Sequence, residues 1–226
     1  MKMRFSLFSK TEFEVSDPIA LVECYCFQND FYSAYHLLTK REVKHVNKIG
    51  ARIPPRLLRK CKAIIDDTRR VGIFKYELLD LDAFLNLSDE AMRRHVEELG
   101  DDAIKRLTSI RGIGLSRATK VLHTLYPHII PMIDSLLQDE YYRVTAHHCK
   151  KGDPGPILIA YYANLKGGPN RRQLDQLHRE VSERGLSLTK VGVFDILWWS
   201  FLKAEKLKGD VRTKGGNLAF TTVKRL

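Results

Sequence analysis

Two helical patterns meet at a pair of glycines near the middle of the chain, in segment 107–122. A single apolar residue, Ile113, separates Gly112 from Gly114. Because glycine tolerates a positive φ, this spacing predicts a tight turn that leads one helix directly into the next. We expect the apolar side chains of both helices to pack against each other. These side chains belong to Leu107, Ile110, Ile113, Ala118, Val121 and Leu122.

Helix start and stop signals recur along the rest of the chain and predict an all-α fold. Capping residues or prolines precede the apolar patterns, and glycines follow them. One helix is expected to start at Ser88 and to end at Gly100, and the next to start at Asp101. The other predicted helices cover 18–27, 31–39, 56–70, 136–143, 169–185 and 189–203. A short strand is expected in 217–223, and a surface connection in 150–156.

The chain carries an excess of positive charge that is local rather than uniform. Lysine and arginine number 38 against 27 aspartates and glutamates, which gives a net charge of +11. Segment 40–62 is strongly basic and contains one acid, Glu42, and segment 203–226 is basic apart from Glu205 and Asp210. Such an excess favours an anionic partner, nucleic acid first and an acidic membrane second. We expect the two segments to share one anion-binding face; the alternative is two separate solvated surfaces.

The cysteine content is typical of a reducing compartment. Cys24, Cys26, Cys61 and Cys149 are too few and too irregular for a secreted disulfide scaffold. A zinc site that combines Cys24 and Cys26 with 147–149 would have a non-standard spacing, so we expect buried thiols and solvated histidines instead of a metal. No apolar run is long enough for a signal peptide or a membrane span. The sequence therefore predicts a cytoplasmic protein with no membrane partner.

An apolar passage, 126–133, follows the second helix of the glycine turn and leads to Asp134. A hairpin of two helices, an apolar passage and then an aspartate is the order of parts in the helix-hairpin-helix DNA glycosylase superfamily, which this chain resembles. The match is specific over 107–135 and looser over 31–142. The flanking segments look more like a little-characterised bacterial branch of the superfamily than like its well-known repair enzymes.

The resemblance implies a single two-lobed helical domain over 1–226. One lobe would be 31–134, with the helix-hairpin-helix at 103–122, and the other would combine 1–30 with 135–226 and its basic tail. The resemblance also implies an activity: a damaged or modified base is flipped out of double-stranded DNA and excised at Asp134, which leaves an abasic site. The protein is then expected to act as a monomer associated with the nucleoid.

Two departures from the superfamily pattern narrow this expectation. Bifunctional members carry a lysine two residues after the second hairpin glycine, where this chain has Ser116, and Lys120 one turn later is expected to point elsewhere. The four-cysteine iron–sulfur loop of several members is absent, since no cysteine follows Cys149. The resemblance therefore implies a monofunctional enzyme with no cofactor, apart from a monovalent cation at the hairpin.

The role of Asp134 also follows from the chemistry of the bond. Breaking an N-glycosidic bond develops positive charge on the sugar, and a buried carboxylate nearby stabilises that charge and orients or deprotonates the attacking water. The alternative role is an N-cap of the helix that follows. Ser135 and Gln138 form a capping box of their own, which would free Asp134 for catalysis.

The expected DNA contacts come from the hairpin, whose glycines let a phosphate approach backbone amides, and from the basic segment. These residues are Gly112, Ile113, Gly114, Ser116, Arg117, Arg52, Arg56 and Arg59. The candidates for a base pocket are Gln28, Asn29, Tyr141 and Tyr142, with a polar turn and core aromatics as the alternatives. The rival function is a non-catalytic DNA- or RNA-binding protein. The sequence leaves open which base is excised, and whether the purpose is repair or defence against modified phage DNA.

Overall fold

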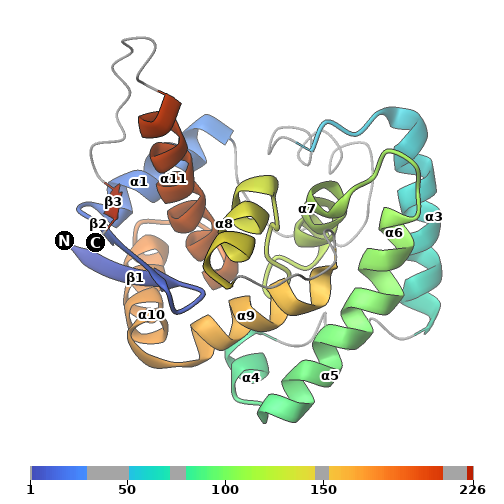
Figure 1. The fold of residues 1–226 in the computed structure, drawn as a ribbon, viewed down its shortest axis with the longest axis horizontal. Coiled ribbons are helices and arrows are strands. Elements are labelled where there is room, and N and C mark those ends of the chain that lie inside the picture. The colour runs from blue at the N-terminus through green and yellow to red at the C-terminus, as the bar shows by residue number, and fades with distance from the viewer. Residues whose placement is uncertain (1, 30–50, 72–79, 146–152, 211–222, 226) are drawn as a thin grey trace. The chain divides into compact units, whose positions relative to one another are not determined.

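The computed structural model describes residues 2–29, 51–71, 80–145, 153–210 and 223–225, and these residues form a mostly helical structure (Figure 1). The chain divides into two compact units. Unit 1 comprises Met1–Tyr32, Leu136–His148 and Tyr161–Leu226, and unit 2 comprises Ser33–Ser135 and Cys149–Ala160. The sequence had assigned 149–160 to the lobe that contains the C-terminus, whereas in the structure this segment groups with unit 2. Among the described residues, no helix has the length and apolar character needed to cross a membrane.

Unit 1 contains a three-stranded antiparallel sheet, in the order β1 (Met3–Leu7), β2 (Thr11–Val15) and β3 (Val223–Arg225). Its helices are α1 (Pro18–Asn29), α8 (Ser135–Thr145, from Leu136 onward), the end of α9 (Pro154–Lys166), α10 (Gly168–Glu183) and α11 (Lys190–Asp210). The aromatic core joins sheet to helix, since the rings of Phe13 and Phe201 stack with centroids 4.7 Å apart. Asp195 is fully buried there and accepts hydrogen bonds from Tyr161 (3.0 Å) and Trp198 (2.8 Å).

The mostly helical structure agrees with the predicted all-α class, but it also contains an N-terminal β-hairpin that the sequence did not predict. Met3, Phe5 and Leu7 are buried at alternate positions, as the two-residue period of a half-buried strand requires. The turn that follows has positive φ at Phe8 (53°) and Ser9 (54°), where hairpin turns usually carry glycine or asparagine. The turn therefore lacks the residues by which a hairpin is normally recognised in a sequence.

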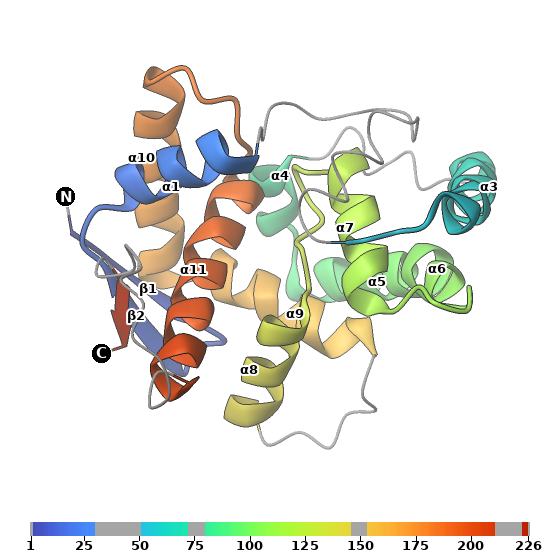
Figure 2. The ribbon, with the colours of Figure 1, turned by 90° about the horizontal axis from the view of Figure 1, so that it is seen from above.

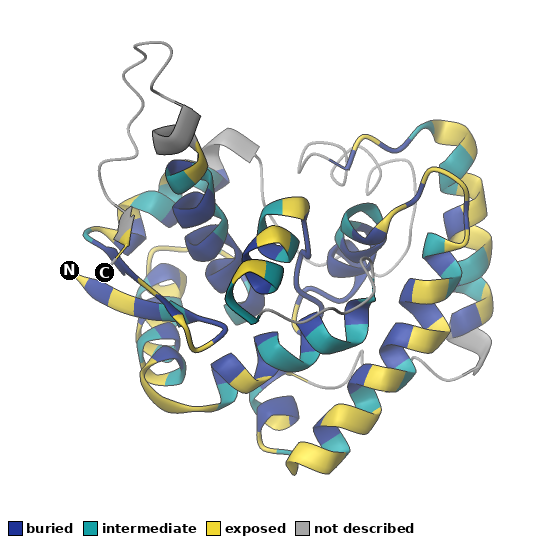
Figure 3. Cartoon of the chain, viewed as in Figure 1, coloured by how far each residue is buried: buried dark blue, intermediate teal, exposed yellow. Residues whose placement is uncertain are grey.

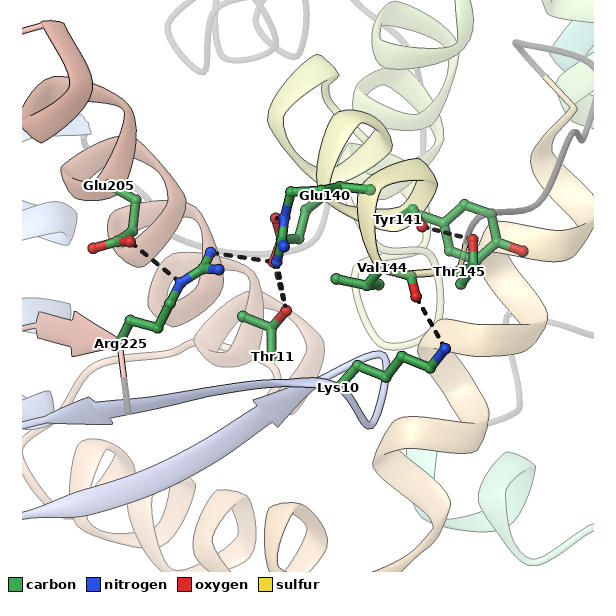
Figure 4. Close-up of polar contacts among 9 residues, drawn as sticks. Lys10, Thr11, Glu140, Tyr141, Val144, Thr145, Glu205 and Arg225 are labelled. Carbon is green, nitrogen blue, oxygen red and sulfur yellow. Dashed lines mark hydrogen bonds and ion pairs between the residues drawn. The ribbon is translucent and has the colours of Figure 1, made fainter.

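A buried ionic cluster fixes α8 within unit 1 (Figure 4). Glu140 of α8 is buried and accepts hydrogen bonds from Thr11 of β2 (2.5 Å) and from Arg143 (2.6 and 2.7 Å). Arg225 of β3 lies 3.4 Å from the same carboxylate and 3.2 Å from Glu205 of α11. One carboxylate thus links three elements that are far apart in the sequence.

Unit 2 is built from helices that lead to the glycine turn. They are α3 (Pro55–Val71), α4 (Leu81–Leu85), α5 (Asp89–Leu99), a π-helical segment (Gly100–Lys105), α6 (Arg106–Thr108), α7 (Leu115–Leu125) and the start of α9. Figure 2 shows α3 alongside α6, and Arg106 of α6 forms an ion pair with Asp67 of α3. Figure 3 shows the alternation of buried and exposed residues along α5, whose buried side chains include Met92, Val96 and Leu99.

The predicted helix end at Gly100 is wrong. Gly100 has helical dihedral angles (φ −61°, ψ −48°), and the chain continues through the π-helical segment into α6 without a break. An added Cβ at Gly100 would lie 3.6 Å from Pro154, so this glycine lies against the start of α9. The start of the helix at Ser88 is confirmed, because its side chain accepts a hydrogen bond from the Ala91 amide (3.2 Å).

The other helix predictions agree with the structure to different degrees. The predictions for α1, α3, α8, α10 and α11 are confirmed within a few residues, apart from the longer C-terminal end of α11. The helices α4 and α9 were not predicted, and the end of the expected surface connection forms the first turn of α9. The predicted helix 31–39, the basic residues 40–48, and most of the expected strand 217–223 lie outside the described residues.

Candidate functional site

The turn between α6 and α7 uses its two glycines differently. Gly112 has φ +95°, a conformation that side chains rarely adopt. Gly114 has φ −89° and ψ 177°, which is extended backbone open to any residue, and it forms the N-cap of α7. The six apolar side chains expected to pack around the turn are all buried, which confirms that prediction.

The start of α7 is open on the side of Gly114. Gly114 is exposed, and an added Cβ would meet no atom within 4 Å. No side chain among the described residues caps α7. The first amides of a helix have no partner within the helix, and the helix dipole gives that end a partial positive charge. The start of α7 at Gly114, Leu115 and Ser116 is therefore a candidate site for an anion.

The Arg117 side chain stabilises this turn by hydrogen bonds to two backbone carbonyls. Its Nε donates to the carbonyl of Ala51 (2.8 Å), and its Nη1 donates to the carbonyl of Gly112. The side chain is half-buried. Arg117 was predicted to contact DNA. In the structure, its Nε and Nη1 hold the segment before α3 against the glycine turn.

Basic residues at the start of α3 lie next to the turn. An added Cβ at Gly112 would lie 3.2 Å from Leu57 in the first turn of α3, so the two segments are in contact. Arg52, Arg56 and Arg59 are exposed, and Arg52 has φ +50°, which is unusual for a residue with a side chain. The structure thus brings the three predicted arginines and the glycine turn together within unit 2.

Asp134 lies at the end of a passage that is bound to α7 by two side chains. Thr119 accepts a hydrogen bond from the Ile133 amide (3.1 Å), and His123 Nδ1 lies 2.6 Å from the Ile130 carbonyl oxygen. Asp134 is 8% exposed and directly precedes α8, whose first residue, Ser135, is exposed. The predicted catalytic carboxylate is therefore buried, and its backbone is anchored one residue away.

Lys120, which the sequence analysis kept apart from the site residues, lies on α7. It is half-buried, and burial lowers the pKa of its ammonium group, while the opposite charge of Asp134 acts to raise it. Where the Lys120 side chain points relative to the site therefore stays a prediction.

The proposed base-pocket residues lie in unit 1. Tyr141 is 3% exposed and packs edge-on against Phe8, with ring centroids 5.1 Å apart, which is the geometry of a core aromatic. Tyr142 is half-buried and contacts Tyr141 (5.6 Å between centroids). Gln28 and Asn29 end α1, and their side chains lie outside the described residues.

The cysteines for which the structure gives a shift behave as ordinary buried thiols. Burial raises the pKa of Cys26 and of Cys61 to about 11, so both remain protonated at neutral pH. Within the described ranges, no three metal-ligating side chains come together. His147, His148 and Cys149 lie outside those ranges.

Comparisons of the chain with protein-family models, with curated proteins and with solved structures find no match. The function of this chain is therefore inferred from the arrangement of residues in unit 2.

Proposed function

We propose that this chain binds double-stranded DNA and hydrolyses the N-glycosidic bond of a damaged or modified base that has been flipped out of the duplex. The observation that carries the proposal is the placement of a buried aspartate, Asp134, beside the helix that begins at the exposed glycine turn. Along α7, Thr119 lies about 7–8 Å beyond Gly114, given the rise of an α-helix.

Two kinds of contact would hold the DNA. The amides at the start of α7 would bind one phosphate, because they are free of side-chain caps among the described residues and carry the positive end of the helix dipole. Arg52, Arg56 and Arg59 would add sequence-independent contacts to neighbouring phosphates. Neighbouring phosphates of one DNA strand could therefore contact the turn and the basic residues at the same time.

Asp134 would perform the chemistry. As the base leaves, positive charge develops on the sugar, and a carboxylate in a poorly hydrated site stabilises that charge more strongly than it would in water. The same carboxylate would orient the attacking water and accept its proton. Ser116 stands at the place where the bifunctional helix-hairpin-helix glycosylases carry a lysine, so the proposed base release uses water as the nucleophile.

The deciding experiment measures abasic sites. The purified protein is incubated with genomic and phage DNAs, the digests are analysed by mass spectrometry for released bases, and alkali then reveals abasic sites as strand breaks. We expect Asp134→Asn to lower base release by at least about a hundredfold while DNA binding is retained. The matched control is Asp139→Asn, an exposed carboxylate on the following helix, which should release bases at the wild-type rate.

Two results would contradict the proposal. Near-normal release by Asp134→Asn would remove the aspartate from the mechanism. DNA binding without base release from any of these DNAs would favour the rival function, a non-catalytic DNA- or RNA-binding protein.

A further inference from the structure

Asp134 stands at the end of a passage that has no regular backbone hydrogen-bond pattern. Residues 126–134 form neither a helix nor a strand between the end of α7 and the start of α8. The apolar side chains of Ile129, Ile130 and Ile133 are buried. Because the burial of apolar surface is non-directional, it holds the passage in unit 2 without fixing the direction in which Asp134 points. Directional hydrogen bonds to a neighbouring element are needed for that.

The hydroxyl group of Thr119 makes the hydrogen bond from α7 that lies next to Asp134. Thr119 is fully buried, and its Oγ1 accepts a hydrogen bond from the Ile133 amide (3.1 Å). The same hydroxyl donates to the carbonyl of Leu115 in the first turn of α7 (3.0 Å). A hydroxyl both donates and accepts, so these two bonds use it in both roles. One side chain thus joins the start of α7 to the residue before Asp134.

Two further hydrogen bonds restrict the same passage. His123 lies further along α7, with its Nδ1 2.6 Å from the Ile130 carbonyl oxygen, so this nitrogen carries the hydrogen. The Asp134 amide donates to the Met132 carbonyl (3.1 Å). All of these residues belong to unit 2. The passage is therefore bonded to α7 at Ile130 and Ile133, and it folds back on itself at Asp134.

We infer that Thr119 is a positioning residue, whose hydroxyl fixes the backbone beside Asp134, and with it the direction of the carboxylate, relative to the start of α7. This inference rests on the proposed function for the role of Asp134, and it adds a fully buried residue that acts only through that aspartate. A misplacement of about 1 Å can lower an enzymatic rate about a hundredfold. Loss of the bond should therefore lower the rate of base release rather than the affinity for DNA.

A second buried threonine of α7 provides a matched control. Thr124 is 4% exposed, and its hydroxyl donates to the Lys120 carbonyl within the same helix (3.0 Å). Valine has no hydroxyl, so Thr119→Val and Thr124→Val each remove one buried hydroxyl from α7. The first change removes a bond to the passage that ends at Asp134, whereas the second removes a bond within the helix.

The test measures base release at saturating DNA, DNA affinity and amide hydrogen exchange on the full chain. We expect Thr119→Val to lower kcat about 10- to 100-fold at unchanged affinity for duplex DNA, and Thr119→Ser, which keeps the hydroxyl, to restore most of the rate. Thr124→Val should keep the wild-type kcat. The Ile133 amide should exchange faster in Thr119→Val and not in Thr124→Val, a readout that requires no activity.

A loss of folded protein would lower the rate and the amount of DNA bound together, so a lower kcat at constant affinity and binding capacity separates positioning from stability. If Thr119→Val is unfolded in a thermal melt, Thr119→Cys, whose thiol is a weak acceptor, takes its place with the same expectation.

A wild-type kcat in Thr119→Val, an equal loss in Thr124→Val, or an unchanged exchange rate at Ile133 overturns the inference and leaves the proposed function standing. Absence of base release by the wild-type protein would instead contradict the proposed function, and with it the role of Thr119.

Discussion

The two glycines of the turn between α6 and α7 are required for different physical reasons, which a pair of matched variants can separate. Gly112→Ala should destabilise the fold by about 1–2 kcal/mol, because alanine is strained at a positive φ. Gly114→Ala should cost less, about 0.5–1 kcal/mol, because its backbone is extended and the space around it is open, so that only the poorer N-cap made by alanine lowers stability. Its methyl group would nonetheless stand where a phosphate must approach, so DNA affinity should fall.

Thermal or denaturant unfolding and a mobility-shift titration measure the two effects on the same proteins. If Gly114→Ala binds duplex DNA as tightly as the wild type, the phosphate does not approach the turn at this residue. If the Gly112 and Gly114 variants have the same free energy of unfolding, the positive φ of Gly112 does not make alanine costly at that position.

The exposed surface of α3 gives a prediction at the scale of the element. Each lysine or arginine contact with a phosphate contributes about 0.9 to the slope of log K against log salt. Replacing Arg56 and Arg59 with alanine should therefore weaken binding to all duplexes alike and reduce that slope by up to about 1.8. The control replaces Arg93 and Arg94, two exposed arginines on α5 of the same unit, and should leave the slope unchanged. An unaltered slope in the α3 variant would show that this surface is merely solvated.

At the same scale, the helices could be predicted from the sequence where local signals act alone. Ser88 caps α5 as its position before Asp89 and Glu90 indicates. The helix end was wrongly predicted at Gly100 because glycine usually marks a helix end, whereas here Gly100 keeps helical dihedral angles and lies against Pro154, a contact that exists only in the folded unit. The N-terminal hairpin was not predicted because its turn lacks the usual sequence signal. Phe8 and Ser9 adopt positive φ at positions where a hairpin turn normally carries glycine or asparagine.

The candidate site was predictable in part. Asp134 was singled out through the resemblance that the order of turn, helix and apolar passage carries, and the structure adds that it is buried. The sequence could not show whether Tyr141 lies in the core or in a pocket, because aromatic residues at helical spacing occur in both. The edge-on contact with Phe8 indicates a core position. The hydrogen bond between Thr119 and the Ile133 amide, which anchors the passage before Asp134 to α7, could not be predicted because it joins residues 14 positions apart in the sequence.

At the scale of the whole molecule, the ionic cluster around Glu140 makes the stability of the fold depend on pH. Burial alone would raise the pKa of the Glu140 carboxyl, but hydrogen bonds from Arg143 and Thr11 and the charges of Arg143 and Arg225 hold it below the ordinary value of 4.5. Because the pKa is lower in the folded state, the cluster stabilises the fold fully above that ordinary value. The stabilisation is lost as the pH falls through the folded pKa.

Glu140→Gln should therefore destabilise the protein by about 1–3 kcal/mol at neutral pH, since it removes hydrogen bonds to a charged group. The difference in melting temperature from the wild type should shrink as the pH falls below 4.5. Glu97→Gln, an exposed carboxylate on α5, is the control and should cause little change at any pH. A constant difference across the pH range would mean that Glu140 acts by packing rather than by charge.

The pairing of β2 with β3 has a consequence for the order in which the chain folds during synthesis. Phe13 and Val15 lie opposite Arg225 and Val223, so the sheet of unit 1 closes only after the last described residues have left the ribosome. The segments of unit 2 are all translated before α10 and α11. Unit 2 can therefore fold before the helices that pack against the N-terminal strands have been synthesised. During this interval one edge of β2 is open to pairing with another chain, which makes slow translation of the C-terminal third a condition that favours aggregation.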